Sequence, residues 1–587
     1  MSIQHLVGFV PQEDTMYRDL TVRETLRFNA RLKADPRMTR AERRAFVNEV
    51  VDILGLKHVQ HSVIGDEMTR GISGGQRKRV NIGIELMGSP LVLFLDEPTS
   101  GLDATTTQML IDSLETLAKL GLTIAMVIHQ PRMEVLKKIH NLVLLQRGGH
   151  EVYVGETEKA LTYFKDQVGV DLPNQTSPAD FFLDLITADQ DKHDVLDEEG
   201  TLVDKWAKYK SERPAFVHDR DEYKDRVVPA RHRPGTFYQI RTVYKRSVVQ
   251  VFNAAGLHFV DALLYIMAGA VAGIVASDDT FMGNQIVMMI NGMVSVVAAL
   301  KVFGGEMHIF KREMMAGVSS LAYFTGKVMA HFPLILMSPI FFLSTYFRMA
   351  YPKNDLGDLY CIILCGMLSG SGLGYFISSV MSEKNATILG VISGLMGILF
   401  AGINPSLKDF STTSIGWIMV TFNYGSWMTG ALFIRESKSV FAAGFTASIG
   451  WLGEKGFHDV DHTKIYSQND IYEAQLRLAE IYRDKLLFMV SQYLWYMVGA
   501  YFVFFYAAKK EQGLIGVDAV VQGFRNGFYD PFLNYLKYGQ WSTELSRREM
   551  DGMDEQRRQK RAKTTAARKV RKEGGRGVAE HAQMEKV

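Results

Sequence analysis

The amino-acid sequence predicts a multidomain protein. An α/β unit, residues 1–186, precedes an all-α domain of six membrane-spanning helices, residues 257–507. Short apolar runs alternate with helical patterns in the first part, which is typical of an α/β unit with a parallel sheet. Apolar segments of near membrane-spanning length recur in the second part. The mean hydropathy of −0.01 agrees with a chain that is partly soluble and partly embedded in a membrane.

Three apolar runs predict the strands of the first unit: Leu91–Leu95, Thr123–Ile128 and Leu142–Leu145. Helical patterns separate them, which is typical of an α/β unit. Residues 187–256 follow as a charged linker with few apolar runs, which ends in a helix that approaches the membrane.

Six apolar segments predict membrane spans, because a helix that crosses about 30 Å of hydrocarbon needs about 20 residues. The loop 305–322 carries Lys311 and Arg312, whereas the loop after the first span carries two aspartates. The positive-inside rule then places loop 305–322, the α/β unit and the tail 508–587 in the cytoplasm, and the segment 404–487 outside it. The spans cover about 257–276, 286–304, 323–347, 359–380, 386–403 and 488–507.

The composition excludes several classes of protein. The net charge of +2 indicates no nucleic-acid partner. The two cysteines, Cys361 and Cys365, fall in a predicted span and cannot form a disulfide framework. Residues 557–572 of the tail are basic and contain no acidic residue. This pattern favours a solvated tail, and contact with anionic lipid is the alternative.

A strand that ends in two carboxylates is predicted at residues 91–97, Leu-Val-Leu-Phe-Leu-Asp-Glu. This is the Walker B pattern of nucleotide-hydrolysing ATPases. Asp96 would hold Mg²⁺, directly or through water, and Glu97 would orient and polarise the attacking water. Taken alone, the pattern also fits a buried strand that ends in a charged loop.

A glycine-rich turn, Gly71-Ile72-Ser73-Gly74-Gly75-Gln76, precedes this strand. Its glycines allow backbone amides to approach a phosphate, and Ser73 adds a hydroxyl donor. A helix that starts there directs its positive end at the anion. The alternative interpretation is an ordinary turn.

Five motifs occur in one order that resembles the ABC-transporter nucleotide-binding domain. Val10–Asp14 resembles its Q-loop and Gly71–Gln76 its signature loop. Leu91–Glu97 resembles Walker B, Ser100–Asp103 the D-loop and Ile128–Pro131 the H-loop. The resemblance implies catalytic roles for Glu97 and His129, an Mg²⁺ site at Gln12 and Asp96, and ATP contacts from Gln12, Ser73, Gly74, Gly75, Gln76 and Asp103.

The order of the domains, with one nucleotide-binding domain before one membrane domain, resembles the ABCG (White) half-transporters. Gly74–Arg79, Ile128–Arg132 and Glu306–Glu313 also resemble that group. In the family the last of these forms the coupling helix between the second and third spans. The resemblance, which runs to about residue 507, therefore implies that four residues transmit closure of the nucleotide-binding domains: Glu306, Lys311, Arg312 and Glu313.

No match to the phosphate-binding loop, G-x-x-x-x-G-K-[ST], occurs in the sequence. In the family this loop precedes the Q-loop, which here begins ten residues from Met1. We expect the sequence to be a truncated part of a complete transporter, because the downstream motifs are intact. The alternative is a natural half-domain that offers Ser73, Gly74 and Gly75 to the ATP of a partner and holds none by itself.

The resemblance implies an ATPase-coupled exporter, a multi-pass protein of a lipid membrane. It would act as a homodimer or as a heterodimer with another ABCG half-transporter. Its cargo would be a lipid, a sterol or another amphipathic molecule. The first alternative is a catalytically silent membrane subunit that pairs with a complete half-transporter, and the second is a membrane scaffold without transport.

Overall fold

The computed structural model describes residues 6–511, apart from 67–68, 130, 147, 174–175, 192–200, 213–233, 279, 351, 353–354, 382, 402–405, 412–413, 440–452, 454 and 456–467. Three predicted features fall partly or wholly outside the described residues. They are the basic tail beyond residue 511, Gln130 of the H-loop and parts of the segment 404–487.

A parallel sheet of three strands organises the first part of the chain. The strands β1 (Val7–Val10), β2 (Val92–Asp96) and β3 (Thr123–Val127) lie in that order, with Val10 paired to Leu95 and Asp96 paired to Val127. Because all three run in one direction, their carboxyl ends meet at the same edge, and the loops that follow them lie together.

Helices pack beside this sheet: those at 74–86 and 104–119 contact β1 and β3, and two further helices pack against the first of these. Thr21, Thr39 and Ser73 each form a capping box with the residue three positions later, which fixes where three helices begin. Apolar residues of these helices and of β2 form one buried core, with Leu26, Val80 and Leu93 fully buried. The elements are α1 (Val22–Lys33), α2 (Arg40–Ile53), η2 (Lys57–Val59), α3 (Gly74–Leu86) and α4 (Ala104–Lys119).

The opposite face of the sheet is also apolar but exposed. Phe9 on β1, Phe94 on β2 and Val127 on β3 are 51%, 44% and 59% exposed among the described residues. Apolar residues on both faces are the pattern of a parallel sheet that helices cover on both sides.

A hairpin and an aromatic cluster follow. Strands β4 and β5 pair antiparallel, and Tyr153, Tyr163, Phe164 and Trp206 pack their rings against one another beside the hairpin. The elements of this region are α5 (Met133–Leu136), β4 (Asn141–Gln146), β5 (His150–Glu156), α6 (Thr157–Tyr163), η3 (Phe164–Val168), α7 (Pro178–Asp191) and α8 (Leu202–Ser211).

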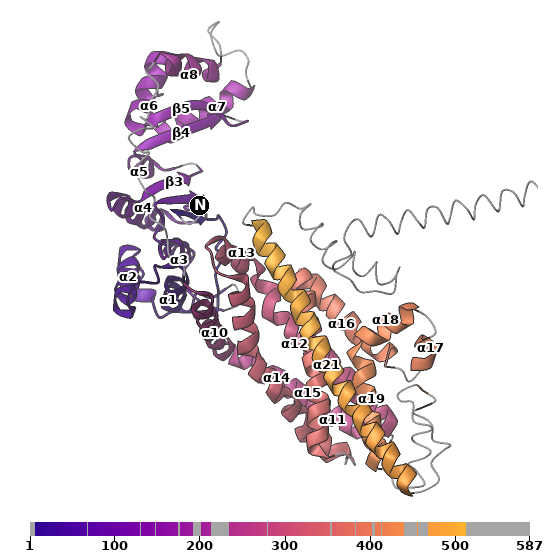
Figure 1. Cartoon of the computed structure of the whole chain (residues 1–587). Coiled ribbons are helices and arrows are strands. Elements are labelled where there is room, and N and C mark those ends of the chain that lie inside the picture. Colours follow the sequence, from indigo (N-terminus) through magenta and orange to yellow (C-terminus); the bar gives the residue numbers. More distant parts are fainter. Residues whose placement is uncertain are drawn as a thin grey trace, which may run out of the picture. The chain divides into compact units, whose positions relative to one another are not determined.

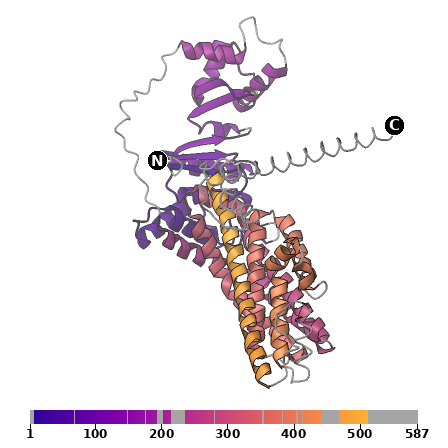
Figure 2. The same ribbon diagram turned by 45° about the vertical axis from the view of Figure 1, so that its right-hand side comes forward.

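The second part of the chain is helical. Figure 1 shows its long helices lying side by side as a bundle, and Figure 2 shows the same arrangement from another direction. In the bundle α11 packs on α14, α12 on α15, and α15 on α21. The elements are α10 (Thr236–Asn253), α11 (Ala255–Asp278), α12 (Thr280–Phe303), η4 (Gly304–Glu306), α13 (Met307–Met315), α14 (Ser320–Ala350), α15 (Leu356–Val380), α16 (Glu383–Leu399), α17 (Leu407–Ser411), α18 (Ser414–Phe422), α19 (Tyr424–Ser439) and α21 (Gln468–Glu511).

Several of these helices are long and apolar enough to cross a membrane. In the described part of the chain the candidates are Ala255–Ala276, Met289–Met315, Ser320–Ala350, Leu356–Val380 and Glu473–Ala507. A shorter apolar stretch, Asn385–Gly397, lies within α16, at the position of the fifth predicted span.

Two helices differ from the expectation for the segment 404–487. Helix α21 begins at Gln468, well before the predicted start of the sixth span at 488, because a polar stretch continues the same helix. Helix α19 packs against α12, α15 and α21, and its residues Met428, Ala431 and Leu432 belong to the buried core of the bundle. The polarity of the sequence alone does not indicate this burial.

Candidate functional site

Three predicted site residues meet at the carboxyl edge of the parallel sheet. Gln12 follows β1, Glu97 follows β2 and His129 follows β3. The amide Nε2 of Gln12 donates a hydrogen bond of 2.7 Å to Oε2 of Glu97, and Nε2 of His129 lies 3.6 Å from Oε1 of the same carboxylate. The carboxylate of Glu97 therefore lies between the side chains that follow the two neighbouring strands.

The backbone of Glu97 adopts an uncommon conformation. Its φ of 43° lies in the left-handed region, which a residue with a Cβ seldom occupies. The amide of Glu97 donates to the carbonyl of Val127, and its carbonyl accepts from the amide of Ser100. These bonds hold the strained turn, and strain of this kind is concentrated at functional sites.

The glycine-rich turn forms the beginning of α3. The hydroxyl of Ser73 accepts from the amide of Gln76, and the side chain of Gln76 accepts from the amide of Ser73. Both side chains are thus used within the cap. A Cβ added at Gly74 would meet no atom within 4 Å, so backbone near the positive end of α3 is open to a ligand.

Gly75 is required for a close approach to the D-loop helix. A Cβ added there would lie 1.9 Å from Cγ2 of Thr106 on α4. We expect Gly75→Ala to lower the free energy of unfolding of the full chain by about 1–3 kcal/mol, because the two methyl groups cannot occupy the same space. The double variant Gly75→Ala/Thr106→Ser, which removes Cγ2, should recover most of the loss in a denaturant titration. An equal loss in both variants would contradict this explanation.

Asp103 caps the next helix. Its carboxylate accepts from the amide of Thr106 at the start of α4, and the hydrogen bonds with Thr106 lower the pKa of Asp103. The structure therefore assigns Asp103 a local structural contact, and its predicted ATP contact remains a prediction.

The predicted magnesium ligands are of a suitable chemical type. Asp96 is the last residue of β2, at the same sheet edge as Gln12. A carboxylate and an amide oxygen are hard ligands, and Mg²⁺ at nucleotide sites takes one or two such groups together with phosphate oxygens. No group of three or more His, Cys, Asp or Glu side chains that could hold a metal ion by itself occurs among the residues that the structure describes.

The Q-loop is tied to α3 by a lysine that the motif search did not single out. The ammonium of Lys78 donates to the carbonyl of Gln12 at 2.6 Å and lies 3.5 Å from the carboxylate of Asp14. Asn81, one turn further along α3, donates to the same carboxylate at 3.2 Å. Lys78 and Asn81 thus link the Q-loop directly to α3.

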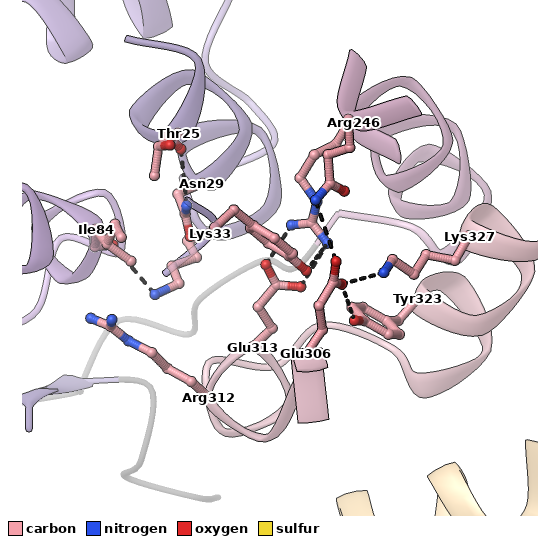
Figure 3. Close-up of polar contacts among 12 residues, drawn as sticks. Thr25, Asn29, Lys33, Ile84, Arg246, Glu306, Arg312, Glu313, Tyr323 and Lys327 are labelled. Atoms are coloured by element: carbon pink, nitrogen blue, oxygen red, sulfur yellow. Dashed lines mark hydrogen bonds and ion pairs between the residues drawn. The ribbon is translucent and has the colours of Figure 1, made fainter. Parts of the chain in front are cut away.

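The other end of α3 contacts the predicted coupling helix, α13. The guanidinium of Arg312 donates to the carboxylate of Glu85 at 2.9 Å and to the carbonyl of Thr15 at 2.7 Å. It also bonds both the side chain and the carbonyl of Asn81. Figure 3 shows Arg312 on the side that faces Lys33. Arg312 thus joins α13 to both the Q-loop and α3.

Lys33 completes the cluster around Glu85, at 3.1 Å. Burial raises the pKa of the Glu85 carboxyl, but the charges of Lys33 and Arg312 outweigh burial, so the net pKa lies below its ordinary value of 4.5. The unfolded chain therefore takes up the proton first as the pH falls. The cluster stabilises the fold above about pH 4.5, and this stability is lost as the pH falls through the lowered pKa.

The acid side of the stability profile tests this assignment. We expect the full chain to lose stability more steeply below about pH 4.5 than Glu85→Gln, which has no carboxyl to titrate at this position. Denaturant titrations between pH 3 and pH 7 measure both slopes. Parallel profiles would show that Glu85 does not contribute to acid sensitivity.

A second buried ion pair joins α13 to α10, the helix that directly precedes α11. The guanidinium of Arg246 bonds both carboxylate oxygens of Glu313 and donates to the hydroxyl of Tyr17 at 2.9 Å. Burial lowers the pKa of Arg246, but the charge of Glu313 outweighs it and the net pKa is raised. Arg246 and Glu313 are 1% and 5% exposed, so the pair is shielded from water.

Of the two remaining predicted coupling residues, Glu306 contacts α14 and Lys311 lies on α13. Glu306 accepts from the hydroxyl of Tyr323 at 3.0 Å and pairs with the ammonium of Lys327, which also donates to the carbonyl of Val302. In Figure 3 Glu306 points toward Tyr323 and Lys327. Lys311 lies half-buried on α13.

Comparison with known proteins agrees with this geometry. Residues 1–100 match the ABC transporter family, and residues 129–211 and 188–466 match the ABC-2 type transporter family. The broad substrate specificity ATP-binding cassette transporter ABCG2 of Sus scrofa is 30% identical over 452 residues, which cover 70% of this chain and 68% of that protein. The chain belongs to the ABCG family of ABC transporters.

Plant members of the ABCG family are similar over a longer stretch. ABC transporter G family member 25 of Oryza sativa is 29% identical over 504 residues, which cover 78% of this chain and 49% of that protein. Family member 28 of Arabidopsis thaliana is 28% identical over 518 residues, which cover 78% and 46%. The chain thus spans about half the length of these curated relatives.

The structure brings the predicted residues of this ABCG protein into two groups. Gln12, Asp96, Glu97 and His129 lie at one sheet edge, while the signature loop lies at the amino end of α3. Sequence reasoning missed the residues that join these groups to the membrane domain: Lys33, Lys78, Asn81, Glu85 and Arg246. The one available signal for such residues was a charge within an otherwise buried helix. A buried charged side chain without a partner is rare, so such a charge indicates a contact with another element.

Proposed function

We propose that this ABCG chain is the half-transporter subunit of an ATP-driven exporter that carries a lipid, a sterol or another amphipathic molecule across a membrane. The observation that carries the proposal is the contact of Gln12 and His129 with Glu97. In a nucleotide-hydrolysing site a carboxylate held in this way orients and polarises the attacking water. The family match and the apolar helices support a protein that is embedded in a membrane.

Each residue at the sheet edge then has a distinct role. Asp96 and Gln12 would hold Mg²⁺, and bound ATP would supply the phosphoryl group whose transfer to water drives the cycle. Glu97 orients the water and accepts its proton. His129, whose side chain is 81% exposed beside Glu97, is placed to contact the terminal phosphate.

The coupling route follows the contacts in order. A shift of Gln12 moves α3 through Lys78, and α3 holds Arg312 through Asn81 and Glu85. Arg312 lies on α13, whose Glu313 pairs with Arg246 on α10. Motion at the nucleotide would therefore reach the helices of the membrane domain through buried ion pairs.

Two chains are needed for a complete site. We assign Ser73, Gly74 and Gly75 to the ATP held on a partner domain, as a homodimer or a heterodimer with another ABCG half-transporter. A second candidate is a catalytically silent subunit that offers only this loop. The open surface at Gly74 supports both functions, because a ligand held by another chain can approach the backbone there.

The orientation follows from charge. We propose that the α/β unit, loop 305–322 and the tail 508–587 lie in the cytoplasm, with six membrane spans between them. Lys311 and Arg312 in loop 305–322 contrast with Asp278 and Asp279 after the first span.

Reconstitution of the full chain tests the proposal. The chain is placed in proteoliposomes alone and with a complete half-transporter, and ATP-dependent movement of a fluorescent phospholipid or sterol is measured. We expect movement in at least one arrangement, and its loss in Gly74→Asp, because a carboxylate would face the phosphates. Gly235→Asp is the matched control, since Gly235 also begins a helix in open space. No movement in either arrangement would overturn the proposal.

A further inference from the structure

A groove between α11 and α12 lies on the surface of the helical bundle, apart from the nucleotide site. Its volume is about 470 Å³ and its wall is almost wholly apolar. Leu264, Met267 and Val271 line it and are 49%, 63% and 55% exposed. In a helix bundle that spans a membrane, such a groove fits a hydrocarbon chain.

An ion pair forms one end of this groove. The ammonium of Lys301 on α12 lies 2.8 Å from the carboxylate of Asp261 on α11, and Nδ1 of His258 lies 3.8 Å from the same carboxylate. The side chain of Lys301 is 44% exposed and that of Asp261 is 20% exposed. A positive and a negative group are thus presented side by side at the end of an apolar surface.

The same pair also lines a cavity inside the bundle. This cavity, of about 230 Å³, lies between α10, α11, α12, α14 and α15. Its wall combines polar groups, among them Lys301, Asp261 and His331, with apolar ones such as Tyr265 and Ile335. Lys301 and Asp261 are therefore common to the groove and the cavity, which together fall within the usual size range of ligand sites.

We propose that the groove and the ion pair form a binding site for a zwitterionic amphiphile within a single subunit. The hydrocarbon chain lies along α11 and α12. A phosphate group accepts from Lys301, and an ammonium group lies against Asp261. This arrangement replaces one ion pair by two charge-assisted contacts of opposite sign, which an anionic or a cationic head group alone cannot make.

The proposal names a cargo class and therefore rests on the proposed transport function. Binding at the site is nevertheless measured in the absence of ATP. The full chain in nanodiscs is titrated with radiolabelled hexadecylphosphocholine. Hexadecyl sulfate and hexadecyltrimethylammonium, which have the same hydrocarbon chain, are used as competitors. We expect the zwitterion to bind at least tenfold more tightly than either competitor.

Variants of Lys301 and of Asp261 test the contribution of each charge separately. Lys301→Gln should weaken binding of the zwitterion and of the sulfate about tenfold, whereas Asp261→Asn should remove the preference for the zwitterion over the sulfate. Val297→Trp, which fills the groove, should abolish binding of all three probes. The matched controls are Arg348→Gln, at the far end of α14, and Val275→Trp, an exposed position on α11 that does not line the groove. Both should bind like the unchanged chain.

Three results would contradict the proposed binding site. Equal binding of the three probes would show that the ion pair does not distinguish between the head groups. Unchanged preferences in Lys301→Gln and Asp261→Asn would have the same meaning. A change in oligomeric state of Val297→Trp, measured by light scattering, would show that a second copy of the chain occupies the groove. Failure of transport with binding intact would instead contradict only the proposed function.

Discussion

Replacement of Glu313 by leucine is expected to lower the free energy of unfolding by about 3–5 kcal/mol, because it leaves the charge of Arg246 buried without a counterion. Arg246 is 1% exposed, and it also contacts Tyr17, through a hydrogen bond and through the ring face at 4.5 Å, and the ring face of Tyr323 at 6.0 Å. None of these contacts neutralises the charge. Pulse proteolysis of the full chain in detergent, across a denaturant series, measures the change.

The matched control removes both charges. The double variant Arg246→Met/Glu313→Leu should be much closer to the unchanged chain than Glu313→Leu, because an apolar pair of similar volume avoids the cost of burying ions. The same double variant should still lose ATP-dependent transport, since the link between α10 and α13 is then no longer polar and directional. A loss of stability as large as that of Glu313→Leu would indicate that packing, and not the unpaired charge, determines the result.

Replacement of Glu97 by glutamine is expected to lower ATP hydrolysis about 10²–10⁴-fold, while ATP binding is kept, in a transporter whose complete chain supplies the phosphate-binding loop that this sequence lacks. The amide retains the hydrogen-bonding shape of the carboxylate but cannot accept the proton of the attacking water. Nε2 of Gln12 and of His129 remain as neighbours of the side chain, so the turn at φ 43° should keep its geometry. Phosphate release at saturating ATP and Mg²⁺ measures the rate, and filter binding measures the affinity.

Glu115→Gln is a suitable control for this experiment, because Glu115 is a surface carboxylate of α4 paired with Lys119. It should leave hydrolysis unchanged. If Glu97→Gln also hydrolyses ATP at the original rate, the sheet edge of this chain performs no chemistry. The silent-subunit function would then be favoured, with only the signature loop of this chain in use.

The meeting of Glu97 and His129 was predictable from the sequence. Both follow apolar runs that were predicted as strands, Leu91–Leu95 and Thr123–Ile128, and carboxyl ends of parallel strands share an edge. The strand before Gln12, Val7–Val10, was not among the predicted strands, so the contact of Gln12 with Glu97 came from the structure alone. The start of α3 was equally predictable, because Ser73 and Gln76 have the spacing of a capping box. The two predictions depend on neighbours in sequence and on one topological rule.

Partners across the fold were not predictable in the same way. Arg312 was singled out as a coupling residue, but its contacts with Glu85 and Asn81 join positions more than 200 residues apart. Lys301 is a charged residue near the end of the predicted span 286–304, yet only the packing of α11 against α12 supplies Asp261 as its partner. No local pattern encodes either pair.

By itself the sequence determined the order of the domains, the motif loops and most of the apolar helices, since hydropathy, strand length and cap spacing are local properties. The tertiary structure decided which charges are buried together, that α19 lies in the core of the bundle, and that α21 begins at Gln468. The physical reason is that burial depends on what packs against a segment. A charged side chain such as Arg246 becomes stable in the interior only where a distant helix places Glu313 beside it.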